Sequence, residues 1–167
     1  MIDYREISES DSKSFLDLML KLDEETDFMM YEVGERSRSV QLQSDEIKKI
    51  ISSNNSTIYL ALDNKIPVGF IVAEGGTFKR NAHCCYLAIG VLKNYSGRGI
   101  GKTLFSKIFD WGDKHNIIRF ELTVMCHNEA AVNLYKKLGF EIEGVKRTSL
   151  IINGKRIDEF YMSKVKQ

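Results

Sequence analysis

The stretch Val91-Leu-Lys-Asn-Tyr-Ser-Gly-Arg-Gly-Ile-Gly-Lys-Thr103 connects a segment with strand-like apolar alternation to apolar residues spaced as in a helix. Glycines and cations gather where the two segments meet: Gly97, Gly99 and Gly101, with Arg98 and Lys102. The first backbone N–H groups of a helix have no partner within it, and the helix dipole adds partial positive charge there. Glycine lets a ligand approach those donors, and the cations favour phosphate. The stretch therefore predicts a pyrophosphate-binding loop.

The spacing of the glycines does not match two common phosphate-binding motifs. A Walker A loop that ends in Gly101-Lys102-Thr103 requires its first glycine at Ser96, and the dinucleotide fingerprint requires a glycine at Lys102. The segment Ser96–Gly101 instead resembles the [QR]-x-x-G-x-[GA] loop of the GCN5-related N-acetyltransferase (GNAT) family. It departs from that pattern at its first position, where Ser96 replaces Gln or Arg.

The composition is typical of one ordinary globular domain. A chain of 167 residues that is 43% hydrophobic and 28% charged can bury one core, so we expect a single domain over residues 1–167. The net charge of +1 argues against nucleic acid as the main partner. We see no secretion signal or membrane-spanning segment and expect a cytoplasmic protein without membrane attachment. The cysteines have neither metal-site nor disulfide spacing, so we expect reduced thiols and no metal: Cys84, Cys85 and Cys126.

Hydrophobic periodicity predicts the order β-α-α-β-β-β-α-β-α-β-β. Strands are expected at residues 1–7, 57–62, 66–73, 82–92, 117–125, 140–152 and 155–165, the last two forming a hairpin. Helices are expected around residues 15–22, from Ser44, over 99–115 and from Asn128 to a stop at Gly139. Strand 82–92 is apolar on both faces and should lie centrally. The fold class is therefore α/β, a mixed sheet of about seven strands with helices on both faces.

A second stretch, Asn128-Glu-Ala-Ala-Val-Asn-Leu-Tyr-Lys-Lys-Leu-Gly-Phe140, is similar to the N-x-x-A…Y-x-x-x-G-F segment of the same family. Together with the element order, the resemblance covers nearly the whole chain. A weaker likeness around Gly34–Arg36 points to the ribosomal-protein acetyltransferase-like branch. The resemblance implies acetyl-coenzyme A as cosubstrate, a primary amine as acceptor, and two splayed central strands between which the coenzyme's pantetheine arm lies.

The resemblance also assigns roles by position. The cofactor-binding residues would be Ile89, Val91, Ser96, Gly97, Arg98, Gly99, Ile100, Gly101, Lys102, Asn128 and Tyr135, with Gly90 leaving room for the pantetheine arm. A backbone N–H near Val91 would polarise the thioester carbonyl, and Tyr135 would act as general acid on the departing thiolate. Tyr135 also fits a buried helical stripe, and Asn128 fits a helix N-cap. Cys85 stands where several relatives carry a glutamate, which leaves the general base unassigned.

Carboxylates are frequent between the first two predicted helices: Glu24, Glu25, Asp27, Glu32 and Glu35. The family usually builds its acceptor site there, so Glu24 and Glu32, together with His83, are candidate acceptor-binding residues. A solvated surface is the alternative for most of them. The expected acceptor is a small-molecule amine or a peptide N-terminus, and the exposed edges of the final hairpin favour a homodimer.

Two other functions remain open at this point. A nucleotide phosphohydrolase or kinase could use Gly101-Lys102-Thr103, although Ser96 argues against it. A non-catalytic sensor or partner module that binds acyl-coenzyme A is the other alternative, and the absence of a glutamate at Cys85 keeps it open.

Overall fold

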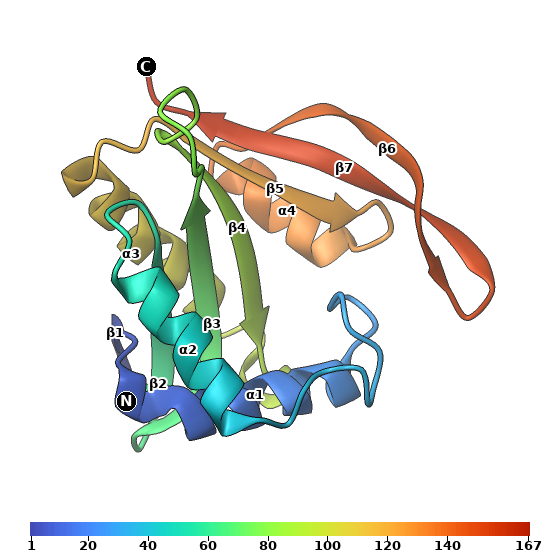
Figure 1. Ribbon diagram of the computed structural model, residues 1–167. Helices are drawn as coiled ribbons and strands as arrows, with labels where there is room; N and C mark the ends of the chain where they lie inside the picture. Colours follow the sequence, from blue (N-terminus) through green and yellow to red (C-terminus); the bar gives the residue numbers. More distant parts are fainter.

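The strands and helices follow one another along the chain in the predicted order (Figure 1). The computed structural model describes all residues, 1–167. The strands are β1 (Ile2–Glu6), β2 (Thr57–Asp63), β3 (Ile66–Gly75), β4 (Cys84–Val91), β5 (Arg119–Met125), β6 (Glu141–Ile152) and β7 (Lys155–Val165). The helices are α1 (Ser12–Glu25), α2 (Val40–Ile51), α3 (Ile100–Lys114) and α4 (Glu129–Lys137), with short 3-10 helices at Glu9–Asp11 and Lys93–Tyr95.

The seven strands form one sheet in the order β1-β2-β3-β4-β5-β7-β6. Neighbouring strands are antiparallel except β4 and β5, which run parallel. Helices α1 and α2 cover one face of the sheet and α3 and α4 the other (Figure 1). The predicted α/β class, strand number and central position of β4 are confirmed. No helix combines the length and the hydrophobicity needed to cross a membrane.

Two local predictions were wrong. Helix α2 begins at Val40 rather than at Ser44, because the Ser39 side chain accepts the Leu42 N–H at 3.2 Å and so caps the helix earlier. Strand β5 begins at Arg119 rather than at the expected residue 117, and Ile118 is 48% exposed. Asn116 has a positive φ of 57°, and the turn it makes places Ile117 in the core, so that β5 starts two residues later than expected.

The core has one layer on each face of the sheet. On the α1 side, Phe15 and Phe70 make an edge-to-face contact with centroids 5.5 Å apart. A Cβ atom on Gly90 would lie 2.8 Å from both Leu22 and Phe70. Gly90 was expected to make room for a coenzyme arm, but this geometry gives it another reason: the close packing of α1 on β3 and β4.

Candidate active site

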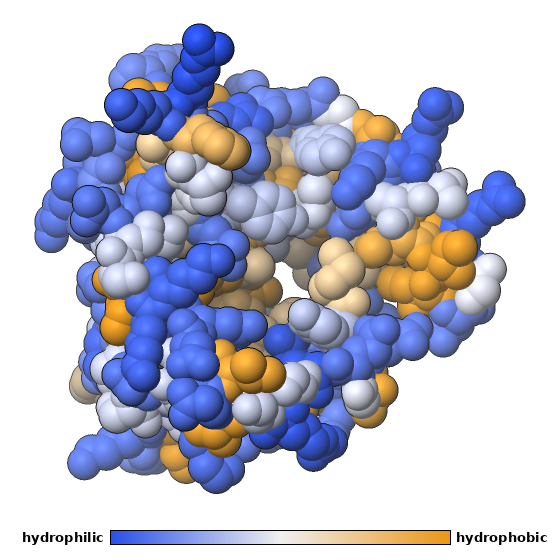
Figure 2. Space-filling view, viewed as in Figure 1, coloured by the Kyte–Doolittle hydropathy of each residue, from blue (hydrophilic) through white to orange (hydrophobic).

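Strands β4 and β5 separate part of the way along their length. They pair only through Cys84–Arg119, Cys85–Phe120 and Tyr86–Glu121, although β4 continues to Val91. The other edge of β4 stays paired with β3 as far as Val91. The side of Leu87–Val91 that faces β5 is therefore unpaired, and backbone groups there can bind a ligand in the manner of an added strand. The predicted splayed strand pair is confirmed, and Figure 2 shows the molecular surface hollowed at its centre.

The glycine loop lies between β4 and α3. Gly97 and Gly99 have φ of +76° and +80°, and a Cβ atom on either would meet nothing within 4 Å. These glycines are therefore required by backbone conformation, and the space beside them is open. Within α3 the first N–H to find an acceptor is that of Thr103, which donates to the Gly99 carbonyl at 3.1 Å. The earlier N–H groups of the helix remain available, so the loop fits a diphosphate group.

The side chains of this loop have separate tasks. Arg98 and Lys102 are exposed, and the Arg98 guanidinium lies 5.0 Å from the centre of the Tyr95 ring. Ser96 is turned to its own backbone, with its hydroxyl 3.4 Å from the Leu92 carbonyl. Ile100 is buried in the core, so only its backbone can face a ligand. The structure thus brings the predicted loop residues together: Ser96 and Ile100 contact the chain itself, whereas Arg98 and Lys102 face solvent.

Gly101 and Ile89 lie where the loop meets the opening. A Cβ atom on Gly101 would lie 3.3 Å from Leu134 and 3.8 Å from Ile89. The glycine therefore allows α3 to approach α4 closely. Ile89 packs against the core from the strand side.

Tyr135 on α4 is 7% exposed and packs against Phe105 and Phe140, with ring centroids 5.6 and 5.9 Å apart. Its hydroxyl has no hydrogen-bond partner in the chain, whereas every fully sealed polar side-chain atom has one. The hydroxyl is therefore not fully sealed and keeps some exposure to solvent. Burial raises the pKa of this phenol above its ordinary value, and the nearby Tyr86 adds to the effect. At neutral pH the phenol is protonated and can donate.

Asn128 is the N-cap of α4, as predicted. Its side-chain oxygen accepts the Ala131 N–H at 3.3 Å. Next to it, the His127 ring lies 5.4 Å from the Phe28 ring of the α1–α2 segment. This contact joins segments on the two sides of the opening.

Tyr86 was not predicted as a site residue. Its hydroxyl lies 2.7 Å from the Thr123 hydroxyl, so that a hydrogen bond joins the last paired residue of β4 to a residue of β5 beyond the paired region. Tyr86, Glu74 and Glu121 lie in one row across three strands and help line a cleft of about 530 Å³. The available signal was a polar aromatic residue within an otherwise apolar strand, which periodicity alone assigns to neither core nor site.

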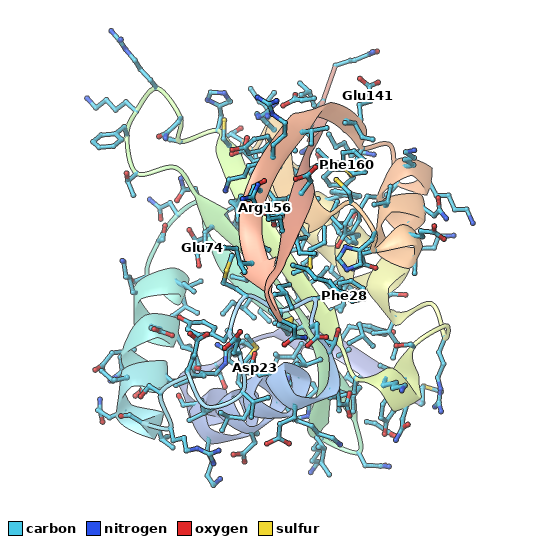
Figure 3. All side chains as sticks on the ribbon, turned by 90° about the vertical axis from the view of Figure 1, so that its right-hand side faces the viewer. Asp23, Phe28, Glu74, Glu141, Arg156 and Phe160 are labelled. Atoms are coloured by element: carbon cyan, nitrogen blue, oxygen red, sulfur yellow. The ribbon has the colours of Figure 1, made fainter.

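The candidate acceptor residues are dispersed. Glu24, Glu32 and His83 are all exposed, and they come from α1, the α1–α2 segment and the turn before β4. The inward-facing carboxylate of this region is Asp23, which binds Arg36 through two contacts of 2.6 and 3.0 Å. Figure 3 shows Asp23 and Phe28 on the side of the molecule toward which the β6–β7 hairpin extends. Sequence reasoning missed Asp23 because its partner lies 13 residues away in an irregular segment.

The cysteines are free thiols, and Cys85 is fully buried. Its thiol lies 3.3 Å from the Asn55 carbonyl, to which it donates. Burial raises the pKa of this thiol to about 12, so Cys85 does not act as a general base at neutral pH.

Comparison with known proteins gives a consistent result. A model of the acetyltransferase (GNAT) family matches residues 17–140. L-amino acid N-acetyltransferase AaaT from Escherichia coli K12 is 33% identical over 100 residues, 59% of this chain and 62% of that protein. N-alpha-acetyltransferase RimI from Mycobacterium tuberculosis is 35% identical over 66 residues, 40% of each chain. The chain thus spans less than two thirds of the length of these curated relatives.

Solved structures agree with the fold over the full length. An acetyltransferase of the GNAT family from Streptococcus pneumoniae has a TM-score of 0.95 and 30% identity, with 99% of each chain covered. A phosphinothricin acetyltransferase from Sinorhizobium meliloti, solved in complex with acetyl-CoA, has a TM-score of 0.86 and 19% identity, covering 98% of this chain and 88% of that one. With its family match, splayed strands and glycine loop, this chain belongs to the acetyltransferase (GNAT) family.

Proposed function

We propose that this chain is an N-acetyltransferase that moves an acetyl group from acetyl-coenzyme A to a primary amine, on a small molecule or a peptide N-terminus. The observation that carries the proposal is the convergence of three features on one opening. These are the glycine loop with free N–H groups, the unpaired edge of β4 and the unpartnered hydroxyl of Tyr135. A loop for diphosphate beside a strand edge for amide groups matches the chemical plan of coenzyme A.

The coenzyme-binding residues act mainly through their backbone. The N–H groups of residues 97–102 would donate to the diphosphate oxygens, and Arg98 and Lys102 would neutralise their charge. The β5-facing edge of Ile89 and Val91 would pair with the pantetheine amides. Asn128 would contribute by fixing the start of α4, and with it the position of Tyr135.

Acetyl-coenzyme A supplies a thioester, whose carbonyl carbon is open to direct attack by a neutral amine in a ternary complex. A backbone N–H near Val91 would donate to the carbonyl oxygen and stabilise the charge that develops there. As the new C–N bond forms and the C–S bond breaks, Tyr135 would give its proton to the sulfur. The phenolate would recover a proton from the acceptor nitrogen, so the protons balance.

The experiment has two parts. Thermal unfolding measured with acetyl-CoA, or with ATP and magnesium, should show stabilisation by acetyl-CoA alone, since a ligand stabilises the folded state it binds. Release of free thiol should then be measured with a set of primary amines. Stabilisation by acetyl-CoA without turnover of any amine would support the other candidate, a non-catalytic acyl-CoA-binding module, which the buried Cys85 favours. Stabilisation by ATP and magnesium would overturn both.

A homodimer stays a proposal as well. Strand β6 is the last strand of the sheet, and it exposes apolar residues such as Val145 (50%) and Ile151 (68%). A second copy could cover this edge. Light scattering at two protein concentrations would measure the mass in solution.

A further inference from the structure

Glu159 on β7 is a buried carboxylate without a partner. The residue is 5% exposed, and its side chain takes part in no hydrogen bond or ion pair of the chain. The other two buried carboxylates are paired: Asp11 binds Arg5 at 2.8 Å, and Asp23 binds Arg36 at 2.6 Å. Glu159 is therefore the one buried carboxylate of this protein that has no cationic partner.

The nearest cation along the sheet does not neutralise Glu159. Lys146 lies directly opposite it on β6, yet the Lys146 ammonium lies over the Tyr161 ring, 5.9 Å from its centre. No completely sealed polar side-chain atom in the chain lacks a partner. The unpartnered oxygens of Glu159 are therefore not fully sealed and keep some exposure to solvent.

The register of the sheet places Glu159 on the face that carries the cleft. Side chains alternate along a strand, so Glu159 shares its face with Tyr161, and Tyr161 is opposite Thr123 on β5. Thr123 in turn binds Tyr86 where β4 and β5 begin to separate. Glu159 itself is opposite Met125, at the end of β5 from which the chain turns toward His127 and α4.

The surroundings of Glu159 are apolar and aromatic. Met125 is 5% exposed, Tyr161 lies two residues along β7, and the Phe28–His127 contact lies beyond the end of β5. A carboxylate in such surroundings costs free energy unless a cation compensates it. The chain supplies no such cation. A cationic ligand should therefore gain more binding free energy at Glu159 than it would at an exposed carboxylate.

We propose that Glu159 binds the positively charged amino group of the acceptor. This inference rests on the proposed function, since it concerns the amine that receives the acetyl group. It also narrows the acceptor class to amines that arrive as ammonium ions with an apolar or aromatic body beside the charge. The ammonium donates to the Glu159 carboxylate, and the body lies against the aromatic residues at the end of β5. Before attack on the thioester, the ammonium gives up one proton to solvent water, so that the reacting nitrogen is neutral.

The test separates charge recognition from shape by measuring binding in the presence of coenzyme A, so that no chemistry is needed. The probes are 2-phenylethylamine, spermidine and a short peptide with a free N-terminus, each by calorimetry, with 2-phenylethanol as the uncharged counterpart of the first. Glu159→Gln should lower the affinity for the amines about 10- to 100-fold, the range of a charge-assisted hydrogen bond. The affinity for the alcohol should not change. Glu159→Asp should retain part of the preference for amine over alcohol.

The control variant is Glu141→Gln, which removes the same charge from an exposed position at the far end of the hairpin (Figure 3). It should bind all the probes as the unchanged protein does. A second readout is the melting temperature without ligand. Glu159→Gln should leave the melting temperature unchanged or raise it, because an uncompensated buried charge is removed. If Glu159 had only a structural role, its replacement would lower the melting temperature by several degrees.

The outcomes separate this inference from the proposed function. If the unchanged protein acetylates amines and Glu159→Gln does so with the same KM for the amine, the inference is wrong and the function stands. If no amine binds the unchanged protein in the presence of coenzyme A, the inference is wrong. If amines bind through Glu159 but no thiol is released from acetyl-CoA, the function is wrong while Glu159 remains an amine-binding residue.

Discussion

The two ends of the opening between β4 and β5 are built in different ways. The proposed coenzyme end is one continuous stretch, residues 96–102, and it presents backbone N–H groups. The proposed acceptor end combines the α1–α2 segment and β7 (Figure 1) with the cleft beside Glu74. There, contacting side chains such as Phe28 and His127 are far apart in the sequence. One end depends on local backbone conformation, and the other depends on packing between distant segments.

Each end also has its own anchor. The Asp23–Arg36 ion pair holds the α1–α2 segment, with side chains 3% and 15% exposed. The glycine loop is held by the Tyr95 hydroxyl, which donates to Asp63 at 2.8 Å. Because the first anchor is an ion pair removed from water and the second is a single hydrogen bond nearer the surface, their loss should differ in magnitude.

The largest effect is expected from Asp23→Asn. It leaves Arg36 without its buried partner, so the free energy of unfolding should fall by about 3 kcal/mol. Affinity of the folded protein for acetyl-CoA should not change, because the anchor lies at the other end. Urea denaturation measures the first quantity and calorimetry the second. Asp17→Asn on the same helix removes a pair whose side chains are 73% and 57% exposed, and its effect should be much smaller. Equal loss in the two variants would contradict the comparison.

Tyr135→Phe tests the group that lies between the two ends. Loss of the proposed general acid should lower kcat about 100-fold, the low end for such groups because a thiolate leaves readily. The KM for acetyl-CoA should hardly change. Tyr4→Phe on β1 is the matched control and should leave kcat unaltered.

The pH dependence sharpens the same test. Burial raises the pKa of Tyr135, so its protonated form persists to higher pH than that of an exposed tyrosine. The kcat of the unchanged enzyme should therefore not decline between pH 7 and pH 10 through loss of this proton. An alkaline decline that is present in the unchanged enzyme and absent from Tyr135→Phe would contradict this.

Gly99→Val tests the dependence of the coenzyme end on backbone conformation. With φ of +80°, a β-branched residue is strained even though nothing lies within 4 Å. A change in the loop's backbone conformation should lower the affinity for acetyl-CoA about 10-fold, as measured by calorimetry. Gly144→Val on β6 also enters open space but at a residue without positive φ, and it should bind normally. Normal binding by both variants would place the diphosphate elsewhere.

The smallest effect is expected from Tyr95→Phe. It removes the hydrogen bond to Asp63 and keeps the ring beneath Arg98. The KM for acetyl-CoA should rise about 2- to 5-fold, as for one net hydrogen bond. Acetyl-pantetheine lacks the diphosphate, so its KM should be the same for both proteins. A parallel rise for both donors would mean that Tyr95 acts on the whole opening.

The sequence by itself determined the element order, the central strand, the glycine loop and the cap at Asn128. Each of these depends on neighbours within a few residues. Gly97 and Gly99 permit a local backbone conformation, and Asn128 bonds to Ala131 three positions away. The family resemblance rested on the same local motifs.

The tertiary structure alone decided how the acceptor end is built. Periodicity could not show that Glu159 is buried without a partner, because that depends on β5 and β6 lying on either side of it. It could not select Asp23 over Glu24, because burial there requires Arg36 to return from an irregular segment. The hydrogen bond of Tyr86 requires Thr123, which the fold places beside it on β5. The burial and the partners of these side chains depend on segments that are distant in the sequence. The hydrophobic pattern contains no information about such long-range contacts.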